Sequence, residues 1–153
     1  MGAQKKLEIV NRRASFNYEL TESMVAGLVL KGTEIKALRE GAGSLNEAFC
    51  FMRDGELFIK NMHIAEYSHG NLMNHEAMRL RKLLLKKREL DRIDSKVREK
   101  GMAIVPVRLF QSERGFAKLE IALGRGKKSF DKRETIKKKE GKREMDRVMK
   151  RYR

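Results

Sequence analysis

The chain has 153 residues, 41% apolar and 37% charged, which is enough apolar material for the core of one domain. Lysine and arginine number 36 against 21 aspartate and glutamate, so the net charge of +15 indicates a polyanionic partner. The single cysteine excludes an internal disulfide and a four-thiolate zinc site, and no apolar run approaches the roughly 18 residues of a membrane span. We therefore expect a cytoplasmic protein without a membrane partner.

The first elements of the chain alternate between strand and helix patterns. Residues 16–20 have an apolar period of two and residues 24–30 form an apolar run, which predicts two strands. A short helix should begin at 32–34 with Thr33 as its N-cap and end at Gly41. A hairpin over 49–59 should follow.

The middle of the chain predicts a tight turn and then a long helix. Asp54-Gly55 is a typical two-residue hairpin turn. Residues 77–100 carry leucine, isoleucine and valine at helical spacing, and Gly101 supplies a C-terminal stop. The other face of this predicted helix is basic, with Arg79, Arg81, Lys82, Lys86, Lys87, Arg88 and Arg92.

Two further strands complete the predicted body of the protein. Residues 102–110 and 116–123 alternate and are joined at 112–115, and Pro106 should lie at a strand edge or a bulge. Six or so short strands with two or three helices favour a mainly β fold, an antiparallel barrel of the OB type that is partly open.

The C-terminal residues differ from the rest in composition. Residues 127–153 contain 13 lysine and arginine residues against 5 acidic ones, and few apolar side chains. We expect residues 1–126 to form the folded body and 127–153 to form a basic tail that is disordered alone. The spacing of Met145, Val148, Met149 and Tyr152 predicts an amphipathic helix that forms on a partner.

The residues provide no support for catalysis, a metal or a cofactor. His63, His69 and His75 lack metal-ligand spacing, Cys50 has no CxxC partner, and no phosphate-loop or nucleophile motif is present. RNA binding has support in Asn11-Arg12-Arg13 beside two aromatics, in the basic helix face and in the tail. The alternatives are core packing of Phe16 and Tyr18, a solvated helix face and a solubilising tail.

Four separated motifs, in order, closely resemble the SsrA-binding protein (SmpB) family of bacterial trans-translation. They are 11–14 with Tyr18; 26–39; 81–85 with 88–90; and 124–128 with 131–133. The resemblance runs nearly end to end. It implies an OB-fold barrel that binds the tRNA-like domain of tmRNA, and a tail that becomes helical in the empty mRNA channel of a stalled ribosome.

The resemblance implies an adaptor without enzymatic activity or cofactor. Its partners would be tmRNA, the ribosome at the 16S rRNA decoding centre and mRNA channel, and elongation factor Tu with alanyl-tmRNA, and the protein would be monomeric. The expected tmRNA contacts are Asn11, Arg13, Lys36, Arg81, Lys82, Leu84, Arg88, Lys118, Lys127 and Lys128. Ribosome engagement is expected at Phe16, Phe130, Asp131, Lys132, Arg133, Ile136, Lys137 and Met149.

Three positions depart from the family pattern. Val25 stands where the family often has glutamate, and Phe16 and Phe130 stand where many members have histidine. An aromatic ring can still stack on a base, whereas the histidine's hydrogen bond and titration are lost. We therefore expect alanine at either phenylalanine to be more harmful than histidine.

A constitutive ribosomal or ribosome-assembly protein with an OB body and a basic rRNA-binding arm is the alternative. Charge and fold do not separate the two functions. The motifs around Gly32-Thr33-Glu34 and Asp131-Lys132-Arg133 favour the adaptor.

Overall fold

The computed structural model describes residues 7–70, 73–127 and 129–151. In the last of these segments it describes the side chains of 133 and 136–147 only. Within the described part of the chain, no helix is long and apolar enough to cross a membrane.

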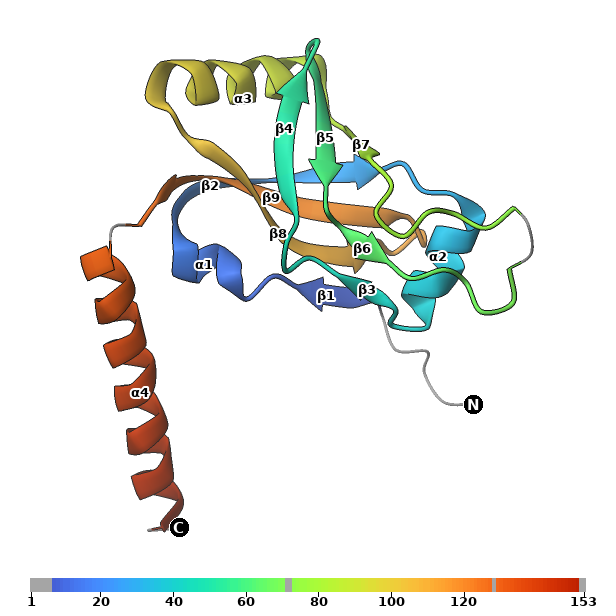
Figure 1. The fold of residues 1–153 in the computed structure, drawn as a ribbon. Helices are drawn as coiled ribbons and strands as arrows, with labels where there is room; N and C mark the ends of the chain where they lie inside the picture. Colours follow the sequence, from blue (N-terminus) through green and yellow to red (C-terminus); the bar gives the residue numbers. More distant parts are fainter. Residues whose placement is uncertain (1–6, 71–72, 128, 152–153) are drawn as a thin grey trace.

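Six antiparallel strands close into a barrel, as the sequence predicts (Figure 1). Around the barrel, β8, β4, β5, β7, β2 and β9 are hydrogen-bonded in that order, and β9 pairs back with β8. The strands are β2 (Tyr18–Leu28), β4 (Phe49–Arg53), β5 (Glu56–Lys60), β7 (Arg81–Leu84), β8 (Ala103–Gln111) and β9 (Ala117–Gly126). A seventh strand, β1 (Glu8–Val10), extends the sheet beside β8, and β3 (Gly43–Ser44) pairs with β6 (His63–Ile64).

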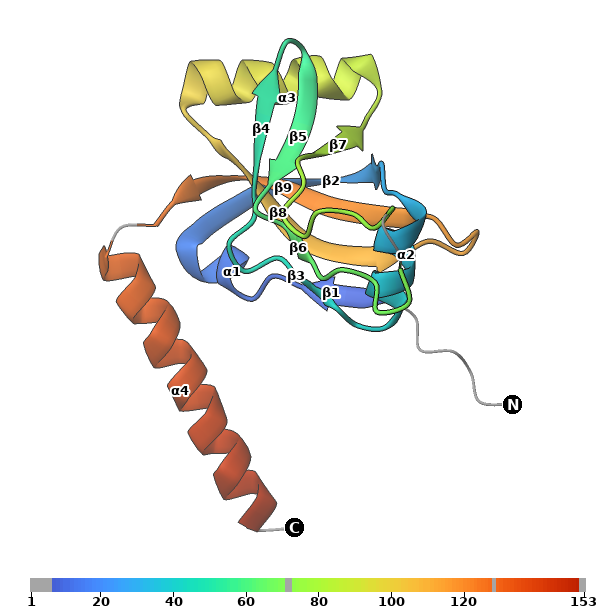
Figure 2. The same ribbon diagram turned by 45° about the vertical axis from the view of Figure 1, so that its right-hand side comes forward.

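The described part of the chain contains four helices, three of which lie against the barrel (Figures 1 and 2). They are α1 (Arg13–Asn17), α2 (Gly32–Arg39), α3 (Lys87–Lys100) and α4 (Ser129–Arg151). The helix α3 covers one open end beside the β4–β5 hairpin, whereas α4 starts near α1 and runs away from the barrel. The predicted helical pattern of the tail is present in α4, although Tyr152 lies outside the described residues, and disorder in the free protein stays a prediction.

The barrel interior is the hydrophobic core. It is filled by alternate residues of the strands, such as Ala26, Leu57, Leu83 and Leu119, all at most 1% exposed. Burial of this alternate set is the main stabilising contribution, because each large apolar side chain adds about 1.5–3 kcal/mol.

Several predicted turns are confirmed. Asp54 and Gly55 have φ of 51° and 77°, as the two-residue turn between β4 and β5 requires. Gly101 ends α3 with φ of 62° and donates its N–H to Val97 O. Pro106 lies at a register shift in the β8–β9 pairing, the predicted bulge.

The prediction of two separate strands over 16–20 and 24–30 is wrong. The first residues belong to α1, and β2 then continues without interruption to Leu28, with a bulge between Leu20 and Glu22. Phe16 and Tyr18 therefore do not share a strand face. The inward and outward alternation of β2 runs through this bulge without a break. The polar run Thr21, Glu22 and Ser23 in the middle of the strand is what makes it look like two strands in the sequence. The short helix over 32–39 is confirmed, but its N-cap is Lys31 rather than Thr33.

The predicted helix over 77–100 is wrong in its first half. Residues 81–84 form β7, in which Arg81 and Leu83 are buried, Lys82 is half-buried and Leu84 is exposed. This strand bridges β5 and β2, so the barrel needs it to close. The helix α3 begins only after Lys86, whose N–H donates to the Glu89 carboxylate at 3.2 Å.

Candidate nucleic-acid interface

Three neighbouring strands place predicted contact residues side by side on the outside of the barrel. In the sheet register, Gly27 of β2 lies opposite Leu84 of β7 on one side and Lys118 of β9 on the other. Leu84 is 53% exposed despite its apolar side chain. The glycine has no side chain, and Leu84 lies close against it: a Cβ at this position would be 3.4 Å from Leu84 Cβ and 3.8 Å from Leu84 Cδ1.

The end of β2 is apolar on the same face, whereas Glu19, Thr21 and Ser23 make the earlier part of this face polar. Val25 and Val29 alternate with the buried Ala26 and Leu28, and they are 51% and 43% exposed. Val25 therefore points outward at the position where the family often has a carboxylate. We call Val25, Gly27, Val29, Leu84, Lys82 and Lys118 the outer patch. Exposed apolar groups flanked by lysines on a strongly cationic protein are typical of a surface that packs on nucleic acid.

Arg81 does not belong to this surface, because it is fully buried. Its Nε donates to Glu34 Oε2, and its two terminal nitrogens donate to the backbone oxygens of Met62 at 2.5 Å and Ala77 at 3.2 Å. The prediction that Arg81 contacts RNA is thereby corrected. The side chain holds β7 to the loops beside it instead.

The carboxylate of Glu34 is the centre of this buried network. It also accepts a hydrogen bond from Arg79 at 2.6 Å and one from the Lys31 N–H at 2.8 Å. Burial raises the pKa of Glu34, but the hydrogen bonds from Arg79, Lys31 and Arg81 outweigh it and hold the pKa below its ordinary value. From the sequence, Glu34 was placed at the start of a helix. Nothing in the neighbouring residues indicates that its side chain is buried.

The predicted basic helix face is divided among several elements. Arg79 pairs with Glu34, Lys82 with Glu56 at 2.8 Å, and Arg92 with Glu22 at 3.0 Å. These cations therefore do not form one continuous basic face, since Glu22 of β2, Glu34 of α2 and Glu56 of β5 neutralise three of them. Lys86, Lys87 and Arg88 stay exposed at the start of α3.

Lys36 and Asn11 take different roles. Lys36 is exposed on α2, with Nζ 5.7 Å from the centre of the Tyr67 ring. Asn11 is buried, and its amide donates to Pro106 O at 2.8 Å while its oxygen accepts from the Arg13 N–H at 3.2 Å. Asn11 thus shapes the start of α1 from inside.

The junction of barrel and tail lies beside α1. Gly126 is opposite Tyr18, and the Lys127 N–H donates to Asn17 O at 2.9 Å. Arg13 is exposed on α1 and pairs with Glu47 at 2.7 Å, and Phe16 is half-buried there. The tail thus leaves the barrel next to Phe16, which is predicted to engage the ribosome, and Arg13, which is predicted to contact tmRNA.

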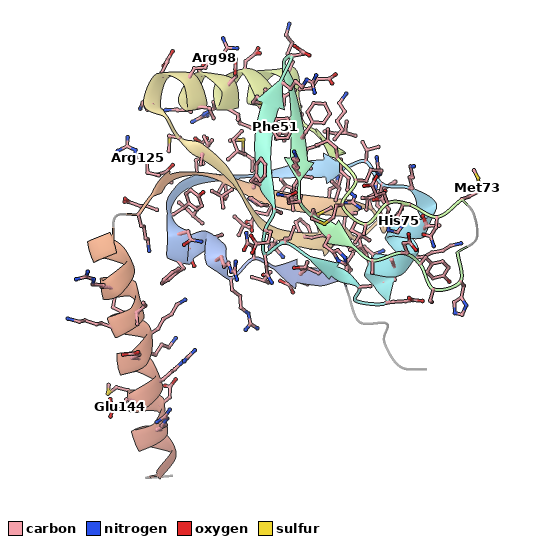
Figure 3. The ribbon with its side chains drawn as sticks, in the orientation of Figure 1. Phe51, Met73, His75, Arg98, Arg125 and Glu144 are labelled. Carbon is pink, nitrogen blue, oxygen red and sulfur yellow. The ribbon has the colours of Figure 1, made fainter. Side chains whose placement is uncertain are left out.

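The tail helix presents the predicted residues that can be placed. Arg133, Ile136 and Lys137 are exposed on α4, as is Glu144 further along (Figure 3). Because 133 and 137 are one helical turn apart, both cations lie on the same face. Lys128 lies outside the described residues, as do the side chains of Phe130, Asp131, Lys132 and Met149.

One histidine and the cysteine are buried in the body of the protein, and the other two histidines are exposed. His75 is 1% exposed, and its ring nitrogens lie 2.9 Å from Thr33 Oγ1 and 2.9 Å from Ile64 O (Figure 3). His63 and His69 are exposed. Cys50 is buried, and burial raises the pKa of its thiol. His75 is therefore a hydrogen-bonded residue of the core.

Comparisons with known proteins agree with the resemblance in the motifs. The family model described as SmpB protein matches residues 8–151. The SsrA-binding protein of Phocaeicola vulgatus is 53% identical over 145 residues, which are 95% of this chain and 97% of that protein. The SsrA-binding protein of Bacteroides thetaiotaomicron is 53% identical over 148 residues, 97% of this chain and 99% of that protein.

A solved structure is similar in fold as well as in sequence. One chain of the structure described as "tmRNA-SmpB: a journey to the center of the bacterial ribosome" has a TM-score of 0.67 and 45% sequence identity. The match covers 80% of this chain and 86% of that one. Because both the family model and these relatives match the chain nearly end to end, it belongs to the SmpB protein family.

Proposed function

We propose that this protein is a non-enzymatic adaptor that binds the tRNA-like domain of tmRNA and delivers it to stalled ribosomes. The relatives are named for SsrA binding, and the similar solved structure is described as a tmRNA complex with the ribosome. In this proposal the protein is a monomer, it acts on ribosomes in the cytoplasm, and elongation factor Tu binds the alanyl-tmRNA together with it.

The alignment of Leu84, Gly27 and Lys118 across three strands is the observation that carries this proposal. The glycine lets the Leu84 side chain lie close against β2, the lysine neutralises phosphate, and the exposed leucine packs on the sugar or base. Lys36, Lys82 and Arg88 extend the cationic surface, and Arg13, Lys127 and Lys128 extend it at the tail junction. Arg81 and Asn11 support this surface from inside.

The tail has a separate role in this proposal. The body of residues 1–126 contains the whole closed barrel and its core, and every side chain described in α4 is exposed. The helix therefore lacks an apolar site on the barrel for those side chains. In the empty mRNA channel, near the decoding centre, Arg133 and Lys137 would contact rRNA phosphates. The other residues that would engage the ribosome are Phe16, Phe130, Asp131, Lys132, Ile136 and Met149.

The test is a titration with two RNAs. The full-length protein and a version ending at Gly126 are titrated with the tRNA-like fragment of tmRNA and with an ordinary tRNA, at two salt concentrations. We expect both proteins to prefer the tmRNA fragment, and only the full-length protein to support rescue of stalled ribosomes.

If neither protein distinguishes the two RNAs, the adaptor function is wrong. Sucrose gradients then test the alternative. A constitutive ribosomal protein would remain stoichiometric with a subunit in cells that lack tmRNA, whereas the adaptor would not.

A further inference from the structure

Two strand bulges open a groove on the outer face of the barrel. The register shifts in β2 between Leu20 and Glu22 and in β8 between Pro106 and Arg108, so each neighbour of β9 carries a bulge. Figures 1 and 2 show these three strands side by side. A groove of about 270 Å³ is lined by residues 20–23 of β2, Val107 of β8, and Glu120 and Ala122 of β9. We call it the bulge groove. Bulges are common where a strand re-aims side chains toward a site.

The bulge groove fits one flat ring rather than a whole ligand. Its volume is below the roughly 300–1,000 Å³ that is usual for small-ligand sites. Leu20 and Val107 are half-buried and provide apolar walls. Ala122, which lies opposite Ser23 in the sheet register, adds only a methyl group. A planar group can therefore place its faces against apolar side chains and its edge against polar ones.

The free polar groups of the groove are mainly acceptors. Arg108 Nε donates to Glu120 Oε2 at 3.2 Å, whereas Glu120 Oε1 has no hydrogen-bond partner among the described residues. The Ser23 hydroxyl is exposed and also has no partner within the described part of the chain. The second carboxylate, that of Glu22, is paired with Arg92 at 3.0 Å. Because an ionised carboxylate only accepts hydrogen bonds, an occupant of the groove has to donate them.

Glu120 is held in one orientation by its partner. The Arg108 guanidinium lies over the Phe110 ring, 4.3 Å from the ring centre, and it also pairs with Glu8 at 3.5 Å. Arg108 is therefore fixed by two further contacts, and it fixes the Glu120 carboxylate in turn. A preorganised acceptor loses less conformational entropy when it binds a ligand.

The bulge groove is continuous with the outer patch. Glu120 lies directly opposite Val25 in the register, and alternation along β9 places it on the same face as Lys118, two residues away. The lysines of the patch attract an RNA backbone, but a carboxylate beside them repels phosphate. The part of an RNA that this carboxylate attracts is a base edge with N–H groups. An acidic peptide has no such edge and would be repelled by Glu120, which disfavours it as the occupant.

We propose that the bulge groove binds an unpaired guanine of the RNA on the outer patch, the tRNA-like domain of tmRNA. Guanine is the base whose Watson–Crick edge has two adjacent donors, N1–H and the N2 amino group, and one carboxylate can accept both. The Glu120 carboxylate binds this edge, and Leu20 and Val107 contact the ring. Glu120 thereby adds base recognition to a surface whose lysines bind phosphates of any sequence. This inference rests on the proposed adaptor function.

The test compares two glutamates that share Arg108 as their partner. Glu120→Gln introduces an amide whose NH₂ group opposes the guanine donors. Glu8→Gln is the matched control, because Glu8 lies on β1 and does not line the groove. Ser23→Leu fills the groove from an exposed position on β2. The full-length variants are titrated with the tRNA-like fragment of tmRNA, and thermal melting checks the fold.

The direction of the effect separates base recognition from simple electrostatics. Removal of a negative charge should raise affinity for a polyanion, so we expect Glu8→Gln to equal or slightly exceed the wild type. Glu120→Gln should instead weaken fragment binding about tenfold or more, as loss of a bidentate base contact does. Ser23→Leu should weaken it as well. An affinity of Glu120→Gln equal to or above that of Glu8→Gln would overturn the proposal.

A second measurement identifies the base. Inosine lacks the N2 amino group, and fragments are prepared with inosine at random in place of a few guanines. RNA with inosine at one unpaired position should be depleted from the wild-type complex but not from the Glu120→Gln complex. A merely structural role of Glu120 would not produce this difference, and the absence of any such position would overturn the proposal.

The two proposals fail in different ways in these experiments. If the wild-type protein does not bind the tmRNA fragment, the adaptor function is wrong whatever the glutamates do. If the wild type binds the fragment and Glu120→Gln binds it equally well, the guanine site alone is wrong.

Discussion

Glu34 lies where no RNA can reach it, yet it controls the surface proposed for RNA. Its carboxylate accepts hydrogen bonds from the Lys31 N–H at the N-terminus of α2, from Arg79 just before β7 and from Arg81 in β7. Arg79 also donates to Val29 O at 3.2 Å, so the network reaches the end of β2. Apart from Lys118 of β9, the outer patch lies on β7 and at the end of β2, so the geometry of that part depends on one buried carboxylate.

Replacing Glu34 by glutamine should be strongly destabilising. The amide keeps the size of the side chain but leaves the buried guanidinium of Arg81 without a counter-charge, which costs about 3–5 kcal/mol. Urea denaturation would measure the free energy of unfolding. The matched control is Glu47→Gln, which removes the exposed partner of Arg13 and should cost at most about 1 kcal/mol. Equal losses in the two variants would contradict the central role of Glu34.

Stability should also depend on pH through Glu34. Because its folded-state pKa is depressed below the ordinary value of 4.5, its stabilising contribution is complete above that value and is lost as the pH falls through the folded-state pKa. Denaturation at a series of pH values below about 5 should show a fall in stability that is smaller in Glu34→Gln than in the wild type. Parallel curves for the two proteins would rule out this assignment.

At the scale of elements, local signals predicted the turns, the short helix α2 and the strands β8 and β9, but not the extent of β2 or the presence of β7. Asp54-Gly55, Gly101 and Pro106 were predictable because each needs a backbone geometry that its neighbours cannot change. Residues 81–84 were not, because leucines spaced for a helix also fit a strand that alternates. Only the need to bridge β5 and β2 selects the strand, and this is a long-range requirement.

The candidate site shows the same division between local and distant information. Leu84 and Lys118 were predicted from motif position, and the register brings them together beside Gly27. Arg81 was misplaced because its partner, Glu34, is distant in the sequence.

Neighbouring leucines of β7 provide a direct test of the strand. Leu84→Ala should weaken binding of the tmRNA fragment several-fold and change stability little, because Leu84 is 53% exposed. Leu83→Ala should instead cost about 2–5 kcal/mol of stability, since Leu83 is 1% exposed in the core. Denaturation and fragment titration of both variants give the measurement. A large loss of stability in Leu84→Ala would contradict the outward direction of this side chain.

At the scale of the whole molecule, a net charge of +15 makes salt the sharpest probe of which residues touch phosphate. Affinity for the tmRNA fragment should fall linearly with salt on logarithmic axes. Lys118→Gln should reduce the slope by about one, because one phosphate contact is lost. Leu84→Ala should weaken binding at every salt concentration with the slope unchanged, since the contact it removes is apolar.

The salt dependence of binding also separates the contribution of the barrel from that of the tail. Removal of residues 127–153 takes away more than half of the net charge, 13 − 5 = +8 of +15. If the barrel alone binds the fragment, this removal should change its slope only by the few contacts at Lys127 and Lys128, while the slope for ribosomal subunits falls by several. A loss for the fragment in proportion to the charge removed would mean that the tail binds tmRNA as a general polycation, and the division of roles would be wrong.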